Sequence, residues 1–222
     1  MSEIGAHLRR IPGLESLYGK QSWHPNGGIG LCIDPFDPAF CFAGDGDGSP
    51  EMEVLEQAYD IIRDLRPTAC AETGTSDGYF SVVCARALED NDHGHLWTCE
   101  INPLRSTATP RPWPKWFSDL KIGHRITPII GNSADPGVWE RANPPLPDKI
   151  QFAFVDSLHE KDHVLAEWRV LGPRMTPNGA VLFHDTRLFE GVAVAVNEIE
   201  ASIPGVVRKE LRSARGASLL VL

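Results

Sequence analysis

Two short apolar runs in the second half of the chain each end in polar residues. Residues 150–155 are followed by Asp156, and residues 179–183 are followed by His184 and Asp185. Short runs of this kind are typical of buried parallel strands, whose carboxyl ends meet at one edge of a sheet. In open α/β sheets, ligands bind in the crevice outside that edge. We therefore expect these three side chains to lie together in a ligand-binding crevice, an arrangement that indicates an enzyme.

A glycine-rich turn follows an earlier apolar run and precedes a helical pattern. It reads Glu72-Thr73-Gly74-Thr75-Ser76-Asp77-Gly78. Glycines allow a tight turn, and a helix N-terminus offers free N–H groups. The spacing matches neither the dinucleotide motif nor the phosphate-binding loop, and a glutamate beside the turn would repel a pyrophosphate but suit an amine. Glu100, which ends the next apolar run, is placed to accept hydrogen bonds from ribose hydroxyls. Together, the glycine-rich turn and Glu100 favour a nucleoside ligand. The alternative is an ordinary strand-to-helix turn and an unrelated surface acid.

The pattern alternates between strands and helices along most of the chain. Strands are expected over residues 68–72, 95–101, 125–130, 150–155 and 180–183, and helices over 50–65, 77–88, 160–171 and 191–203. Residues 206–211 and 217–222 flank a Ser-Ala-Arg-Gly turn and predict a terminal antiparallel pair. Repeated β-α units followed by such a pair predict a three-layer α/β sandwich.

Two segments stand apart from this pattern. Residues 1–50 are rich in glycine and proline and show no periodicity, so they form a separate N-terminal segment, a cover for the substrate or an oligomer contact, before a domain that spans residues 51–222. Residues 103–120 hold four prolines and two tryptophans and predict a long loop or an irregular short helix. That loop would serve either as a lid over the substrate or as a contact between subunits of a dimer.

Bulk composition excludes several classes of partner and compartment. The net charge of −9 disfavours a sequence-independent nucleic-acid binder, which needs a basic face. The five cysteines are odd in number and none has Cys-x-x-Cys spacing, which is typical of a reduced, cytoplasmic protein. The first ten residues lack the apolar core of a secretory signal, and no run of about 18 apolar residues predicts a membrane span.

The polar cluster suits proton removal from a hydroxyl group. A divalent cation lowers the pKa of a bound hydroxyl, and a nearby base takes the proton. Asp156 and Asp185 supply oxygen ligands that suit Mg²⁺, whereas the nitrogen of His184 is better tolerated by Mn²⁺ or iron. His159, one turn beyond Asp156, has the pKa of a general base. Alternatively, Asp156 caps the following helix and His184 points away from the site. His163 is expected on the outer face of that helix, and Glu167 outside the site.

The glycine-rich segment from Ala71 to Ser81 resembles the first motif of class I S-adenosylmethionine-dependent methyltransferases, an acidic residue followed by Gly-x-x-x-Gly-x-Ser. The resemblance implies a Rossmann-like sandwich with a seven-stranded, mostly parallel sheet whose last strand is antiparallel. It also implies S-adenosylmethionine as cofactor, with Gly74 and Gly78 along its methionine part, Glu72 near its ammonium and Glu100 on its ribose. The implied cofactor-binding residues are Glu72, Gly74, Thr75, Ser76, Gly78, Ser81, Glu100, Ser133 and Asp156, with Ser133 at the adenine.

A second set of motifs narrows the resemblance. The stretches Asp156-Ser157-Leu158-His159, Pro177-Asn178-Gly179 and His184-Asp185 resemble those of the macrolide-sugar, cephalosporin-hydroxylase-like and rhamnosyl O-methyltransferases, with Asn178 in place of a glycine. The resemblance implies a divalent cation, Mg²⁺ or Mn²⁺, held by Asp156, His184 and Asp185. It also implies a catalytic pair, His159 as general base with Asp156.

The sequence thus predicts a metal-dependent O-methyltransferase that acts on a hydroxyl of a small molecule, a sugar or a natural product, and forms a dimer. Two alternatives stay open. One is a metal-dependent hydroxylase or hydrolase that uses only the Asp-His-Asp cluster, and the other is a non-catalytic S-adenosylmethionine-binding protein. The acceptor itself is not predicted, because residues 1–50 and 103–120 carry no decodable motif.

Overall fold

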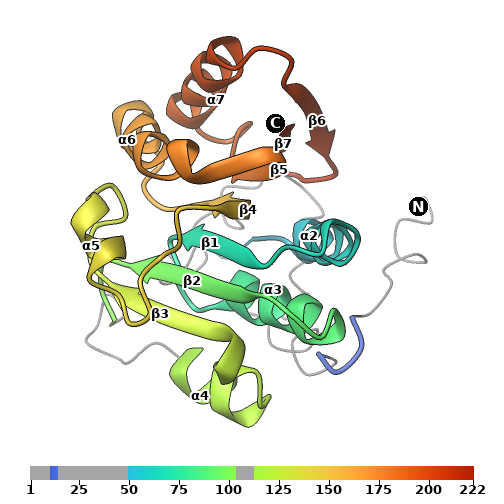
Figure 1. The fold of residues 1–222 in the computed structure, drawn as a ribbon. Helices are drawn as coiled ribbons and strands as arrows, with labels where there is room; N and C mark the ends of the chain where they lie inside the picture. The colour runs from blue at the N-terminus through green and yellow to red at the C-terminus, as the bar shows by residue number, and fades with distance from the viewer. Residues whose placement is uncertain (1–10, 15–49, 104–112) are drawn as a thin grey trace, which may run out of the picture.

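A single seven-stranded sheet organises the computed structural model, which describes residues 11–14, 50–103 and 113–222 (Figure 1). The strand order is β3-β2-β1-β4-β5-β7-β6, and every neighbouring pair is parallel except those made by β7. The strands are β1 (Ala69–Thr73), β2 (His95–Glu100), β3 (Ile126–Ile130), β4 (Ile150–Val155), β5 (Met175–His184), β6 (Val207–Leu211) and β7 (Ala217–Val221). The predicted sheet, with its antiparallel last strand, is confirmed.

Helices cover both faces of the sheet. The helices α2 (Met52–Leu65), α3 (Tyr79–Asp90) and α4 (Trp113–Asp119) pack on one face, and α5 (Pro136–Glu140), α6 (Lys161–Leu171) and α7 (Glu190–Ser202) on the other. Alternate strand residues feed two separate cores. In β4, Phe152 and Phe154 join the first core, and Ala153 and Val155 join the second. Period-two alternation with both faces buried explains why these runs are almost wholly apolar.

Part of the N-terminal segment packs onto the domain. Ile11 and Leu14 are almost completely buried in the core that α2 and α3 share. The remainder of the segment, residues 1–10 and 15–49, lies outside the described residues, as do the expectations for a cover or oligomer contact made there. The segment 1–50 is therefore anchored to the domain over at least one short stretch.

The sheet differs from the expectation in two places. The residues 177–179, expected as a turn before the fifth strand, lie inside β5, where the pairing with β4 shifts register between Ile150 and Phe152. Asn178 has a positive φ of 64°, which is compatible with a local irregularity of the strand. The short helix α5 was not expected, because its five residues are too few for a helical period to show.

The start of α4 and three of the cysteines lie in buried surroundings. Residues 104–112 lie outside the described part, but Trp113 begins the short helix α4 and is buried beside Phe117. Cys70, Cys84 and Cys99 are free and buried. Across the described residues, none of the helices combines the length and apolar character that a membrane crossing needs.

Candidate active site

The glycine-rich turn joins the ends of three central strands. Gly74 has a φ of +77°, and its N–H donates to the carbonyl of Cys99 at 2.9 Å. A Cβ at Gly74 would stand 2.0 Å from the carbonyl oxygen of Asp156. Only glycine fits at such a contact, which holds the end of β1 against the residue that follows β4.

Gly78, the second glycine of the motif, has a different neighbour. It precedes α3 with a φ of +85°, and a Cβ there would stand 2.4 Å from the Cβ of Trp113. Gly78 therefore accommodates the packing of α4 against the start of α3. It does not line the cavity described below.

Three further motif residues form a buried polar layer with Thr98. The Ser81 hydroxyl donates to Glu72, and the Thr75 and Thr98 hydroxyls are 2.5 Å apart. Burial raises the pKa of Glu72 to about 8, against the lowering effect of its hydrogen bonds with Ser81 and Thr98. Glu72, Thr75 and Ser81 do not line the cavity, so their contacts shape the turn from inside the protein.

Glu100 ends β2, and its side chain binds main-chain N–H groups of the glycine-rich turn and of the segment after β2. Its carboxylate accepts hydrogen bonds from the N–H of Ser76 at 2.8 Å and of Asn102 at 3.1 Å. The side chain lines the cavity while the residue as a whole is 7% exposed. A carboxylate fixed in this way at a strand end is arranged to receive paired hydroxyl donors.

One cavity of about 340 Å³ connects the glycine turn with the polar cluster. Its volume lies within the range of small-molecule sites. Its wall comes from the end of β2, the segments that follow β1, β2, β3 and β4, and the first turn of α6. The lining residues are Gly74, Ser76, Cys99, Glu100, Ile101, Asn132, Ser133, Asp156, Ser157, Leu158, His159 and His163.

A buried carboxylate supports the cavity wall near Ser133. Glu167 of α6 is fully buried, accepts a hydrogen bond from the hydroxyl of Ser133, and accepts another from Ser157 at 2.6 Å. His163 lies on the cavity wall with its Nε2 3.4 Å from Glu167. The expectation that placed His163 on an outer face was therefore wrong, whereas Glu167 itself lies behind the wall and does not line the cavity. The first turns of α6 face the strand ends, which a helical wheel alone does not reveal.

The two aspartates and two histidines predicted for the cluster do converge. His159 Nε2 lies 3.0 Å from Asp185 Oδ2 and 3.3 Å from Asp156 Oδ1. His184 Nδ1 lies 3.3 Å from Asp156 Oδ2 and 3.4 Å from Asp185 Oδ1. Asp185 adopts a positive φ of 59°, which is uncommon for residues other than glycine and is typical of functional sites. Asp156 does not cap α6, whose N-cap is Glu160.

His159 occupies the accessible side of this cluster. Its side chain is 26% exposed, whereas those of Asp156 and Asp185 are nearly inaccessible. The imidazole stacks on Phe189 with ring centroids 4.2 Å apart. Just beyond, Gly191 at the start of α7 leaves room for the His159 carbonyl, which would lie 2.9 Å from an added Cβ. The first turn of α7 therefore holds the His159 loop in place.

The close charges shift the pKa of His159, His184 and Asp156. Burial favours the neutral imidazoles, but Asp156 and Asp185 outweigh it and raise the pKa of His159 to about 9. For His184, burial is likewise outweighed by Asp185, Asp156 and Glu51, which raise its pKa to about 10. Burial would raise the pKa of Asp156, but His184 and His159 lower it below its usual range. Without a cation, the cluster is thus balanced by imidazolium groups at neutral pH.

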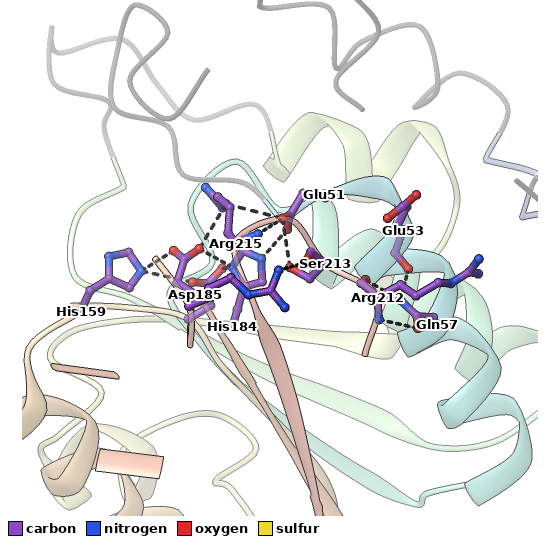
Figure 2. A network of polar contacts seen from close by, with 11 residues as sticks. Glu51, Glu53, Gln57, His159, His184, Asp185, Arg212, Ser213 and Arg215 are labelled. Carbon is purple, nitrogen blue, oxygen red and sulfur yellow. Dashed lines mark hydrogen bonds and ion pairs between the residues drawn. The ribbon is translucent and has the colours of Figure 1, made fainter. Parts of the chain in front are cut away.

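Glu51 and Arg215, which no sequence motif indicated, complete the network (Figure 2). Glu51 Oε2 lies 2.5 Å from His184 Nε2, and Arg215 Nε lies 3.1 Å from Asp185 Oδ1. Both residues are buried, at 4% and 5% exposure. Burial opposes ionisation of Glu51, but His184 and Arg215 lower its pKa to about 2. Glu51 is the residue before α2, and Arg215 lies in the turn between β6 and β7, so both are far from the glycine-rich motif in sequence.

Three ligand atoms in this cluster fit a metal ion. One atom each from Asp156, His184 and Asp185 all lie within 4.8 Å of one another. His184 Nδ1 and both carboxylate oxygens of Asp185 are buried and make ion-pair contacts, but no contact with hydrogen-bond geometry, among the described residues. Buried polar atoms left without a hydrogen bond are rare, and a bound cation would satisfy them. Two carboxylates and one imidazole are a donor set for a divalent first-row metal or Mg²⁺.

Comparison with known proteins agrees with this architecture. A family model described as a methyltransferase domain matches residues 71–186, which is more than half of the chain. Among curated proteins, none matches. Residues 71–186 run from the glycine turn to the end of β5 and so include the strand ends that form the cavity.

Several solved structures share the fold. The O-methyltransferase TomG from Streptomyces achromogenes, involved in tomaymycin synthesis and solved with S-adenosylmethionine, is 16% identical, with a TM-score of 0.63, over 78% of this chain and 81% of that one. PaMTH1 of Podospora anserina, bound to S-adenosylhomocysteine, is 17% identical, with a TM-score of 0.60, over 78% and 79%. The O-methyltransferase from Bacillus cereus, in complex with S-adenosylhomocysteine, is 15% identical, with a TM-score of 0.58, over 77% and 80%.

The sheet order and the site at its carboxyl edge define a Rossmann-like nucleoside-binding class of protein. Within that class, the chain belongs to the methyltransferase domain family that residues 71–186 match. It is a class I S-adenosylmethionine-dependent methyltransferase.

Proposed function

We propose that the protein transfers a methyl group from S-adenosylmethionine to a hydroxyl of a small molecule, with a divalent cation in the Asp-His-Asp cluster. One observation carries the proposal. A single cavity is lined by Ser76 and Glu100 at one end and by Asp156 and His159 at the other. The carboxylate that we propose for the ribose and the candidate base therefore face the same space. The O-methyltransferase neighbours and the motifs shared with sugar and natural-product enzymes support a hydroxyl acceptor of that kind.

The cofactor end is assigned by hydrogen-bonding capacity. Glu100 would accept the two ribose hydroxyls, and Ser133 would lie at the adenine. The backbone of Gly74 and Ser76 would run along the methionine part, with Asp156 at its far end. The remaining motif residues, Glu72, Thr75, Gly78 and Ser81, would shape the turn and not touch the cofactor.

The reacting end is assigned by access and proton affinity. The acceptor oxygen attacks the methyl carbon, a C–O bond forms, and the C–S bond breaks with its electron pair left on sulfur. The acceptor proton passes to Nδ1 of the His159 imidazole, because Nε2 donates to Asp156 and Asp185, which orient the ring. A divalent cation, when bound by Asp156, His184 and Asp185, supplies Lewis acidity that lowers the pKa of the acceptor hydroxyl. With the cation held there, the carboxylate charge that otherwise keeps His159 protonated would be offset.

The domain boundary and the assembly belong to the same proposal. The catalytic domain would span residues 51–222, and residues 1–50 and 103–120 would choose the acceptor and contribute to a cytoplasmic dimer. Size-exclusion chromatography with light scattering tests the dimer. A monomer at micromolar concentration would remove that part of the proposal and leave the chemistry unaffected.

The first test is calorimetric titration with S-adenosylhomocysteine, with and without Mg²⁺ or Mn²⁺. Micromolar binding is expected, followed by methyl transfer from labelled S-adenosylmethionine to members of a sugar and phenol panel. Asp185→Ala is expected to abolish both transfer and its cation dependence while S-adenosylhomocysteine still binds. Absence of binding under every condition would overturn the assignment of the cofactor site. Turnover that requires iron and oxygen but no S-adenosylmethionine would instead establish a hydroxylase, and binding with no transfer to any acceptor would favour a non-catalytic role.

A further inference from the structure

We infer that Glu51 is a positioning residue for the cation site: it holds His184 with Nδ1 turned toward Asp156 and Asp185, so that the site prefers Mn²⁺ to Mg²⁺. The inference rests on the proposed cation site and adds to it a residue outside the matched family segment. Glu51 lies immediately before α2, and its carboxylate contacts the residue that ends β5 (Figure 2).

The hydrogen bond between Glu51 and His184 fixes which imidazole nitrogen faces the cluster. A carboxylate accepts hydrogen bonds, so the 2.5 Å contact places a proton on His184 Nε2. In the neutral ring, the other nitrogen then carries a lone pair. That nitrogen, Nδ1, is the one that lies 3.3 and 3.4 Å from the oxygens of Asp156 and Asp185. A cation bound there would replace the proton that Nδ1 carries in the cation-free protein, and would meet the nitrogen lone pair together with the two carboxylates.

Glu51 is itself held rigidly. Its Oε1 accepts hydrogen bonds from the N–H of Arg215 at 2.9 Å and from the hydroxyl of Ser213 at 3.0 Å. One carboxylate oxygen therefore binds the turn between β6 and β7 while the other binds His184. Because both oxygens are engaged, the carboxylate cannot rotate away without loss of several contacts, and the imidazole keeps its orientation.

The chemistry of the donor set gives the metal preference. Imidazole nitrogen binds Mn²⁺ and later first-row ions better than Mg²⁺, which strongly favours oxygen ligands. A carboxylate on the far nitrogen raises the basicity of a ligating imidazole and typically contributes about 10- to 100-fold to metal affinity. Glu51 and His184 thus act together to supply a nitrogen as the third ligand, at a position where a carboxylate oxygen would favour Mg²⁺.

The experiment compares Mn²⁺ and Mg²⁺ binding to the full chain by calorimetry, and adds pulsed EPR of bound Mn²⁺. The unaltered protein is expected to bind Mn²⁺ at least about 10-fold more tightly than Mg²⁺ and to show ¹⁴N coupling from a coordinated imidazole. Glu51→Ala is expected to weaken Mn²⁺ binding about 10- to 100-fold. The double variant Glu51→Gln/His184→Asp keeps a donor–acceptor pair at these positions and is expected to lose both the ¹⁴N coupling and the preference for Mn²⁺.

Controls separate this inference from the proposed function. Ser213→Ala removes one contact of Glu51 on the side away from His184 but leaves the hydrogen bond from the Arg215 N–H, so it should change the ratio of Mn²⁺ to Mg²⁺ affinity much less than Glu51→Ala does. Binding of S-adenosylhomocysteine reports that each variant is folded. If the unaltered protein binds neither ion, the cation site itself fails. If Mn²⁺ binds without ¹⁴N coupling, or with equal affinity in Glu51→Ala, the role of Glu51 is wrong while the cation site stands. The EPR spectrum of the unaltered protein tests the nitrogen ligand even if a variant does not fold.

Discussion

Gly74 and Asp156 are in direct backbone contact, and this contact joins the two halves of the site. A Cβ at Gly74 would stand 2.0 Å from the Asp156 carbonyl oxygen and 2.8 Å from the Cα of Ser157. The N–H of Asp156 also donates to the Thr73 carbonyl at 3.2 Å. The turn assigned to the cofactor and the carboxylate assigned to the cation are therefore positioned by each other.

Gly74→Ala is expected to lower the free energy of unfolding by about 2–5 kcal/mol. The left-handed conformation costs a residue with a side chain about 1–2 kcal/mol, and displacement of the packed Asp156 backbone adds about 1–3 kcal/mol. Gly205 is a matched control, because it has the same φ of +77° but nothing within 4 Å of an added Cβ. Gly205→Ala should cost only the conformational strain. Urea denaturation of both variants measures the difference, and equal losses would show that the contact with Asp156 is easily relaxed.

Glu100→Ala is expected to weaken S-adenosylhomocysteine binding about 10- to 100-fold, because hydrogen bonds to a charged group contribute about 1.5–3 kcal/mol. The carboxylate also holds the N–H groups of Ser76 and Asn102, so some of the loss will arise from a looser turn. Glu100→Gln retains one acceptor oxygen and should lose less. Calorimetric titration with S-adenosylhomocysteine measures the loss of affinity in both variants. An affinity equal to that of the unaltered protein would show that Glu100 does not bind the ribose.

Much of the fold could be predicted because apolar runs and helical periods are local signals. The strands predicted over residues 68–72 and 150–155 correspond to β1 (Ala69–Thr73) and β4 (Ile150–Val155), which are fully or almost fully buried, as their lack of alternation indicated. The length of β5 could not be predicted, because Pro177, Asn178 and Gly179 usually mark a turn and here form an irregular stretch of strand. Pairing between strands depends on neighbours distant in sequence, and a single segment does not reveal it.

The candidate site was predictable only where its residues follow strands. Asp156, His184 and Asp185 were identified because parallel strands bring their carboxyl ends to one edge. Glu51 and Arg215 follow no such rule, since the residue before α2 and the β6–β7 turn reach the cluster only through tertiary packing. A buried glutamate before a helix has no sequence signature that distinguishes it from an ordinary acidic first turn.

Glu167→Gln is expected to weaken S-adenosylhomocysteine binding about 3- to 10-fold, which corresponds to about 1 kcal/mol for one hydrogen bond. The hydroxyls of Ser133 and Ser157 both donate to Glu167, which leaves their lone pairs available to accept from an adenine amino group. The neutral amide of glutamine at position 167 can donate to one of these serine oxygens. That hydroxyl would then donate toward the adenine amino group instead of accepting from it.

S-inosylhomocysteine, which carries an oxygen in place of the adenine amino group, makes that test specific. The unaltered protein should bind it less tightly than S-adenosylhomocysteine, and Glu167→Gln should reduce the difference. If both ligands lose affinity to the same extent, Glu167 supports the wall of the cavity without orienting the serine hydroxyls. Ser133→Ala serves as the matched control, because it removes one hydroxyl and leaves the carboxylate in place.

The charged cluster predicts how cations and pH act on stability. The pKa of His159 is raised to about 9 and that of His184 to about 10, above the ordinary value near 6.5. Groups whose pKa is higher in the folded state bind protons more tightly there, so folding takes up protons between the two values. Their stabilising effect is complete below about pH 6.5 and is lost as the pH rises through about 9 and 10. The melting temperature of the cation-free protein should therefore fall over that interval.

A divalent cation should reverse this trend, because it competes with the protons of both imidazoles. Saturating Mg²⁺ is expected to lower the pKa of His159, which ¹H–¹⁵N NMR of the imidazole can follow, and to raise the melting temperature most at high pH. His159→Gln removes one of the two titrating groups and should reduce the slope of melting temperature against pH in the cation-free protein. A His159 pKa that stays near 9 in the presence of saturating cation would show that the ion does not bind between Asp156 and Asp185.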